Sequence, residues 1–111
     1  MNKLNNRRII LPDGTKLNTY TADIFSLNSL EVEAGTTGYM GGDSGHGGRT
    51  YFRIQDTGCT DIEVNSFIDE HDCCGFEVIL GGDSELETTI RALKFIANVL
   101  EGKIKEANDV C

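Results

Sequence analysis

Apolar and polar residues alternate with a period of two in four stretches of the first 80 residues, the pattern of strands with one buried face. The clearest stretch is residues 29–34, where apolar and charged side chains alternate. The others are residues 49–56, 61–67 and 75–80. In the last of these we expect Phe76, Val78 and Leu80 to point inward.

Two shorter β-prone runs, residues 7–11 and 16–21, flank a turn sequence. Pro12-Asp13-Gly14-Thr15 supplies the residues that tight turns require. These runs therefore predict a hairpin, and the first 80 residues together predict five or six strands.

Helical spacing begins only near residue 84, where Ser84 and Glu87 have the spacing of a capping box. We expect a helix from there to about residue 105. Its apolar positions are Leu86, Ile90, Leu93, Ala97, Leu100 and Ile104, widened by Ala92, Phe95, Ile96 and Val99. So broad an apolar stripe indicates a helix that packs deeply on a sheet or also meets a second subunit.

The predicted fold is α+β: a small antiparallel β-sandwich-like domain with a long C-terminal helix. We expect one domain over residues 1–111, mainly β over 1–80 and helical over 84–105, because about 100–150 residues is the commonest domain size.

The densest chemistry lies in the glycine-rich segment 35–51, where seven glycines surround a histidine and an arginine between two tyrosines. Glycine permits positive φ and close approach of a ligand, so successive N–H groups can point at one anion. The P-loop pattern is absent and no helix pattern follows the segment. It therefore favours an anion cradle over a plain connection.

In this interpretation the glycine amides, His46 and Arg49 hold phosphate, Tyr39 and Tyr51 stack on a base, and Asp43 bonds ribose or base. The full set of candidate ligand-binding residues is Tyr39, Met40, Gly41, Gly42, Asp43, Ser44, Gly45, His46, Gly47, Gly48, Arg49, Tyr51 and Arg91. Two alternatives stay open: Arg49 pairs with an acid of the same sheet, and Arg91 pairs with Glu87 on the helix surface.

Charge excludes one class of partner. The net charge is −8, and ten acidic residues but no lysine or arginine lie between Arg53 and Arg91. Long nucleic acids need a basic stripe, so we expect them to be repelled. A small anion in one local basic pocket remains compatible, since charges are screened beyond about 8 Å in physiological salt.

Catalytic and metal chemistry has little support. No nucleophile with a base, catalytic carboxylate pair or open metal site stands at recognisable spacing, so we expect no enzyme and no cofactor. Cys59, Cys73, Cys74 and Cys111 are expected to be free thiols. A zinc site with His71 is a weaker alternative, because adjacent cysteines fit a tetrahedron poorly. No apolar run indicates export or membrane insertion, so a cytoplasmic location is expected.

The segment Glu33-Ala-Gly-Thr-Thr-Gly-Tyr-Met-Gly-Gly-Asp-Ser-Gly-His-Gly-Gly-Arg-Thr-Tyr-Phe-Arg-Ile and the later Val78-Ile-Leu-Gly-Gly-Asp-Ser-Glu-Leu resemble the phage Thoeris anti-defence sponge proteins. The likeness covers roughly residues 30 to 100. It implies a homo-oligomer, a dimer or higher, in the cytoplasm of an infected bacterial cell. It also implies that the protein sequesters cyclic ADP-ribose-type or other cyclic nucleotide signals without cleaving them.

Two other classes remain open. The acidic run makes the chain a candidate nucleic-acid mimic that binds a basic host defence protein. An enzyme that degrades the nucleotide is the third hypothesis, and the state of the released ligand separates it from a sponge.

Overall fold

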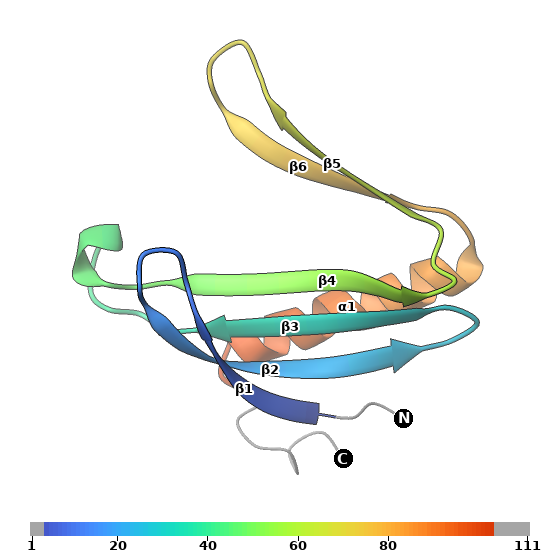
Figure 1. Ribbon diagram of the computed structural model, residues 1–111, viewed down its shortest axis with the longest axis horizontal. Coiled ribbons are helices and arrows are strands. Elements are labelled where there is room, and N and C mark those ends of the chain that lie inside the picture. Colours follow the sequence, from blue (N-terminus) through green and yellow to red (C-terminus); the bar gives the residue numbers. More distant parts are fainter. Residues whose placement is uncertain (1–3, 104–111) are drawn as a thin grey trace.

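The computed structural model describes residues 4–103, which form a four-stranded antiparallel sheet, a separate two-stranded hairpin and one long α-helix (Figure 1). The sheet has the order β1 Leu4–Ile10, β2 Lys16–Phe25, β3 Ser29–Thr36 and β4 Thr50–Gly58. The hairpin pairs β5 Ile62–Ile68 with β6 Cys74–Leu80, and α1 spans Asp83–Leu100. This confirms the α+β class with antiparallel sheets and a C-terminal helix.

The core lies between the four-stranded sheet and α1. Alternate residues of β2 and β3 face the helix, including Ile24, Leu30 and Val32, which are fully buried. The helix contributes Ala92, Phe95, Ile96 and Val99. Period-two strands and a period-3.6 helix thus present one apolar face each, and these faces bury each other.

The opposite face of the sheet is concave, because the β1–β2 hairpin reaches back toward β4. Its turn residue Asp13 meets Arg49, just before β4, at 2.6 Å between Oδ2 and Nε. The predicted 12–15 turn is confirmed, and Gly14 has φ of 90° there.

One charged residue of the alternating stretch 29–34 is not exposed to solvent. Glu33 is fully buried on the concave face. Its carboxylate accepts hydrogen bonds from Arg7, Arg53 and the hydroxyl of Thr19. A buried carboxylate is tolerable only with such partners, and three side chains far apart in sequence provide them.

The predicted capping box at the start of α1 is wrong. The helix begins one residue earlier, after Gly82, and no side chain caps it. The hydroxyl of Ser84 instead donates to the side chain of Asn28 at 2.6 Å and accepts from the amide of Leu27. Tertiary contact with the β2–β3 turn therefore outweighs the local cap.

The helix also ends earlier than residue 105. Gly102 has φ of 79°, its amide bonds to the carbonyl of Val99, and the amide of Lys103 bonds to that of Asn98. This is the Schellman arrangement, which terminates helices at a left-handed glycine. Ile104, Lys105 and Cys111 lie outside the described residues.

The expected helical stripe divides into two faces. The residues that were expected only to widen the stripe, Ala92, Phe95, Ile96 and Val99, form the buried face. Leu86, Ile90 and Leu93 of the expected stripe are exposed. A stripe this broad exceeds what one sheet can cover.

The hairpin β5–β6, with its flanking residues 59–61 and 81, forms an arm that projects from the sheet (Figure 1). Its base is fixed: the carboxylate of Glu85 accepts from the amide of Asp61 at 3.1 Å, and Asp61 pairs through its backbone with Gly81. Phe76, expected to be inward, is 60% exposed. A two-stranded hairpin alone cannot bury its apolar face.

Candidate functional site

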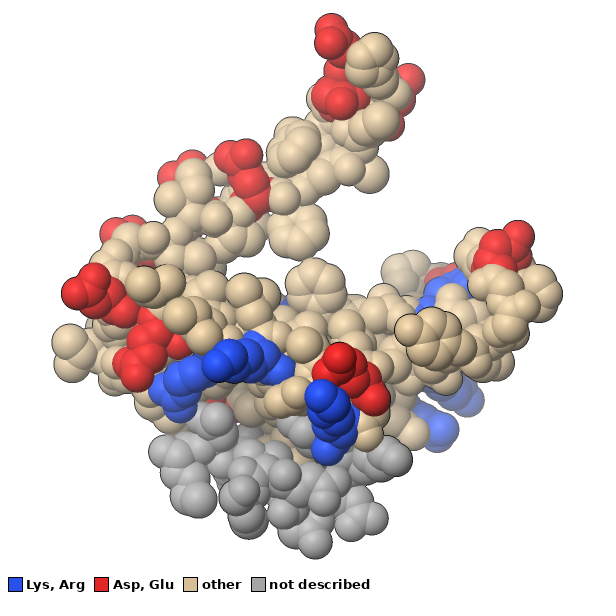
Figure 2. Space-filling view, turned by 180° about the vertical axis from the view of Figure 1, so that it is seen from behind, with Lys and Arg blue, Asp and Glu red and all other residues tan. Residues whose placement is uncertain are grey.

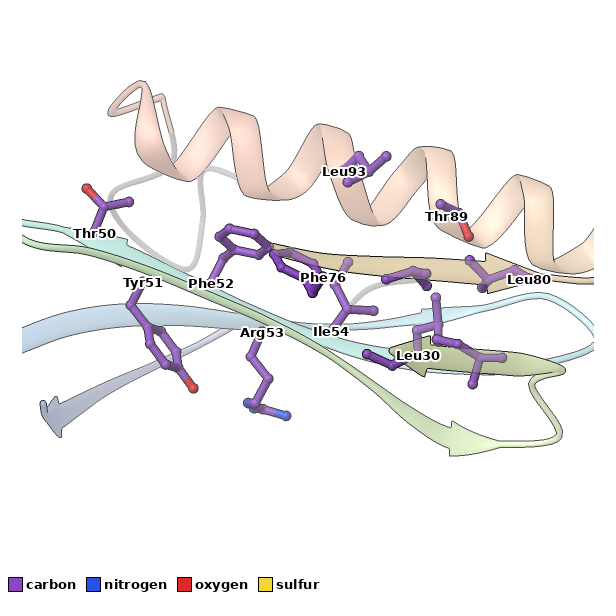
Figure 3. A pocket seen from close by; sticks show the side chains of 13 residues that line it. Leu30, Thr50, Tyr51, Phe52, Arg53, Ile54, Phe76, Leu80, Thr89 and Leu93 are labelled. Carbon is purple, nitrogen blue, oxygen red and sulfur yellow. The ribbon is translucent and has the colours of Figure 1, made fainter. Parts of the chain in front are cut away.

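A cleft of about 760 Å³ separates the arm from β4 and α1 (Figure 3). Its apolar walls come from three elements: the inner face of the arm, the helix-facing side of β4 and one flank of α1. The main apolar side chains are Phe52, Ile54, Ile62, Val64, Phe76, Val78, Leu80 and Leu93. Its volume and lining fall within the usual range for small-molecule sites, about 300–1,000 Å³ and mostly apolar.

Two aromatic rings face each other across this cleft. Phe52 on β4 and Phe76 on β6 have ring centroids 6.2 Å apart and planes inclined by 48° (Figure 3). Both rings remain roughly half exposed. They present flat apolar surfaces on which a planar group can stack.

The hydroxyl of Thr89, on the α1 wall of the cleft, is buried and has no hydrogen-bond partner among the described residues. An unsatisfied buried hydroxyl costs about 1–3 kcal/mol. It is the one polar side-chain atom of this kind in the described part of the chain, and it lies beside the apolar lining.

The glycine loop, residues 37–49, joins β3 to β4 and adjoins one end of the cleft, since Thr50 belongs to the cleft wall. Gly38, Gly41 and Gly47 have φ between 80° and 91°, which other residues rarely adopt. A short 3-10 turn spans Ser44–His46, and the carboxylate of Asp43 caps it by accepting from the amide of Gly45. The loop thus has a defined conformation.

Arg49 fixes this conformation. Besides Asp13, its guanidinium donates to the carbonyls of Ser44 and Gly48 at 2.9 and 2.7 Å. The sequence left open whether Arg49 contacts a ligand or pairs with an acid of the same sheet. In the structure Arg49 pairs with Asp13. Hydrogen bonds from Thr15 and Arg49 lower the pKa of Asp13 to about 2.

His46 lies over its own loop. Its Nδ1 is 3.3 Å from the carboxylate of Asp43, and a Cβ on Gly42 would overlap the imidazole ring. The close approach explains why glycine occupies position 42. Both polar arms predicted for phosphate, His46 and Arg49, therefore contact the loop itself.

Some loop amides do lack partners. The amides of Gly45, His46 and Gly47 are hydrogen-bonded within the turn, whereas those of Gly41, Gly42 and Gly48 have no partner among residues 4–103. Exposed N–H groups of this kind are the feature that an anion cradle requires.

The other predicted site residues are distributed unevenly. Tyr39 is fully exposed and Met40 half exposed on the loop. The side chain of Tyr51 points to the side of β4 away from α1 and the cleft, as does that of Arg53 (Figure 3). Both residues thus lie on the same face of β4, as alternation along residues 49–56 requires.

Arg91 is not near the glycine loop. Its guanidinium donates to the carbonyl of Phe25 at 2.7 Å, and Phe25 pairs with Ser29 at the start of β3. The loop follows the other end of β3, roughly 23 Å away for eight residues of strand. α1 runs parallel to β3, so Arg91, in the first half of the helix, lies near the start of β3, whereas the loop follows its end.

The concave face supplies a second polar cluster, formed by Arg7, Glu33, Arg53 and Glu31. Burial alone would raise the pKa of Glu33, but hydrogen bonds from Arg7, Thr19 and Arg53 outweigh it and the pKa lies below the ordinary 4.5. The Glu33 carboxylate correspondingly raises the pKa of Arg7. Each charge has its partner, so the cluster is structural.

Sequence reasoning missed Phe52 and Phe76 as site residues, because alternation placed both on the apolar faces of their strands. A usable signal existed. The predicted strands 61–67 and 75–80 form a pair with one apolar face, and a lone hairpin cannot bury that face from water.

Within residues 4–103, no three His, Cys, Asp or Glu side chains are grouped as metal ligands. Cys59, Cys73 and Cys74 are unpaired and exposed. The helical part of the described chain contains no segment both long and apolar enough to cross a membrane.

Comparison of this chain with protein-family models, with curated proteins and with solved structures finds no match.

Proposed function

We propose that this protein binds and sequesters cyclic ADP-ribose-type or other cyclic nucleotide signals in the host cytoplasm without cleaving them, as a homo-oligomer. The observation that carries the proposal is the apolar cleft with two facing aromatic rings, which opens next to a glycine loop with unpaired amides.

A nucleotide combines a flat, largely apolar base with charged phosphates. The apolar cleft suits the base, and the neighbouring glycine loop suits the phosphates. A base stacks on Phe52 or Phe76, where each stacked base contributes about 1–3 kcal/mol. The phosphates lie at the amides of Gly41, Gly42 and Gly48. Thr50 follows the loop directly and belongs to the cleft wall, and two strand residues, about 6.6 Å, separate it from Phe52. The loop therefore adjoins the wall that carries this ring.

Sequestration is preferred over hydrolysis because of the groups that line the cleft. Its lining has no histidine, carboxylate or cysteine. In the adjoining glycine loop, His46 and Asp43 contact each other at 3.3 Å. General acid–base or nucleophilic chemistry needs such groups within hydrogen-bond reach of the substrate.

The test is calorimetry with cyclic ADP-ribose and 3′,5′-cyclic nucleotides, followed by heating of the complex and chromatography of the released ligand. Intact ligand and saturable binding support the proposal. Fragments of the ligand would indicate an enzyme, and no heat with any of these ligands would contradict nucleotide capture.

One observation favours a second candidate, a nucleic-acid mimic that binds a basic host defence protein. The arm, residues 59–81, carries Asp61, Glu63, Asp69, Glu70, Asp72 and Glu77 but no lysine or arginine. Figure 2 shows acidic side chains along the arm and at its tip. Rows of carboxylates on a projecting element resemble the charge of a nucleic-acid strand.

Charge reversal on the arm separates the two candidates. Glu63→Lys with Glu77→Lys should leave nucleotide binding unchanged, because both residues lie on the hairpin face opposite the cleft. If the mimic is correct, the same variant loses its protein partner, and binding of the unaltered chain weakens steeply with salt.

A further inference from the structure

The outer face of α1 carries a second apolar row. Leu86, Ile90 and Leu93 are 61%, 45% and 53% exposed, and Ala97 continues the row. Their spacing of four, three and four residues is that of the a and d positions of a coiled coil, with leucine at d and isoleucine at a. The row therefore forms a narrow seam of the kind that a second helix covers.

Charges beside this row are self-complementary. Glu87 and Lys94 both follow a d-position leucine directly, so they share one edge of the seam, the e positions. If two such helices run antiparallel with Ile90 opposite Leu93, Glu87 of each copy faces Lys94 of the other. In the described residues Lys94 makes no ion pair.

We propose that a second copy of this chain docks on Leu86, Ile90, Leu93 and Ala97, about a two-fold axis that sets the two α1 helices antiparallel. The homo-oligomer of the proposed function thereby gains a contact surface and a two-fold symmetry. The dimer proposal rests on the homo-oligomeric state given there and does not require that a nucleotide be bound.

The size of the seam sets the expected strength. The row is about 16 Å long, so two copies bury an area at the low end of protein interfaces, typical of weak complexes. Leu93 also belongs to the cleft wall, so the apolar surface continues from the seam toward the arm. We expect a dimer with a dissociation constant of about 1 μM or weaker.

Ile90→Glu in the full chain tests the seam by sedimentation or light scattering over a dilution series. It should raise the dimer dissociation constant at least about tenfold, since it buries an unpaired charge. Ile79→Glu is the matched control, because Ile79 is as exposed as Leu93 but lies on the outer face of the arm, away from the cleft. It should leave the dimer intact, and circular dichroism should show both variants folded.

Charge exchange tests the antiparallel direction. Glu87→Lys and Lys94→Glu should each weaken the dimer about threefold or more, and the two together should restore it. A chain that is monomeric at all concentrations overturns the proposal. So does a dimer that survives Ile90→Glu, or one that the double exchange fails to restore. Calorimetry of the Ile90→Glu variant with cyclic nucleotide tests ligand binding separately from dimer formation. If the monomeric variant still binds nucleotide, the proposed function does not depend on this dimer.

Discussion

The ring of Phe52 on β4 faces the ring of Phe76 on β6, with 6.2 Å between their centroids. The two residues belong to different sheets, so their contact connects two walls of the cleft. Neither ring is part of the core, because about half of each is exposed. Exposed aromatic surface on facing walls is the physical basis for proposing a planar ligand there.

Replacing either ring should therefore weaken capture. Phe52→Ala and Phe76→Ala should each raise the calorimetric dissociation constant for the cyclic nucleotide by about 5- to 150-fold, the equivalent of one lost stacking contact. Phe67→Ala is the matched control, since that ring is similarly exposed but lies on the outer face of the arm. Equal losses in all three variants would exclude a specific role for the cleft.

Arg49→Ala should loosen the glycine loop without unfolding the protein. It removes the pair with Asp13 and two bonds to loop carbonyls, yet an exposed ion pair contributes only about 0–1 kcal/mol to stability. Faster amide hydrogen exchange at Thr37 and at position 49 and weaker nucleotide binding are expected, with little change in Tm.

Asp13→Ala is the companion variant, because it breaks the same pair and keeps the cation. If it loosens the loop as much but retains binding, Arg49 itself contacts the ligand. Unchanged exchange in both variants would contradict the anchoring role.

The buried carboxylate of Glu33 should make the fold sensitive to acid. Because its folded-state pKa lies below the ordinary 4.5, its contribution to stability is complete above that value and is lost as the pH falls through the folded-state pKa. The free energy of unfolding should therefore decline below about pH 4.5.

Glu33→Gln should cost about 1.5–3 kcal/mol at neutral pH, since it removes charge-assisted hydrogen bonds, and should flatten the acid limb of the stability curve. Urea unfolding at several pH values measures both. An acid limb as steep as that of the unaltered chain would show that other carboxylates dominate.

Gly35→Ala should destabilise the sheet by about 1–3 kcal/mol through overpacking. A Cβ at position 35 would lie 2.5 Å from the carbonyl oxygen of Asn18 and 2.8 Å from Cγ2 of Thr19. Gly48→Ala is the control, because its nearest neighbours would be 3.6 Å away or more. Equal melting temperatures for the two variants would contradict the close packing of β2 on β3.

Local patterns predicted the elements well. The turn at Asp13, the strands and the helix follow from period-two and period-3.6 spacing, which depend on neighbours in sequence. The misses involve distant partners. Ser84 bonds to Asn28 instead of capping its helix, and Glu33 is buried because Arg7 and Arg53 reach it.

The candidate site was predicted in part for the same reason. The glycine loop was identified from composition, and its left-handed glycines are present. The cleft was not predicted, because alternation placed Phe52 and Phe76 on apolar strand faces. Only the structure shows that the arm projects from the sheet and leaves both rings about half exposed. Arg91 was grouped with the loop although the length of β3 separates them.

The most direct test of nucleotide capture is an amide NMR titration of the full chain with cyclic ADP-ribose. We expect saturable shifts for Gly41, Gly42 and Gly48 together with Phe52 and Phe76, and the ligand intact at the end. Shifts confined to the outer face of the arm, or none at all, would contradict the proposal that the cleft and the glycine loop form one binding site.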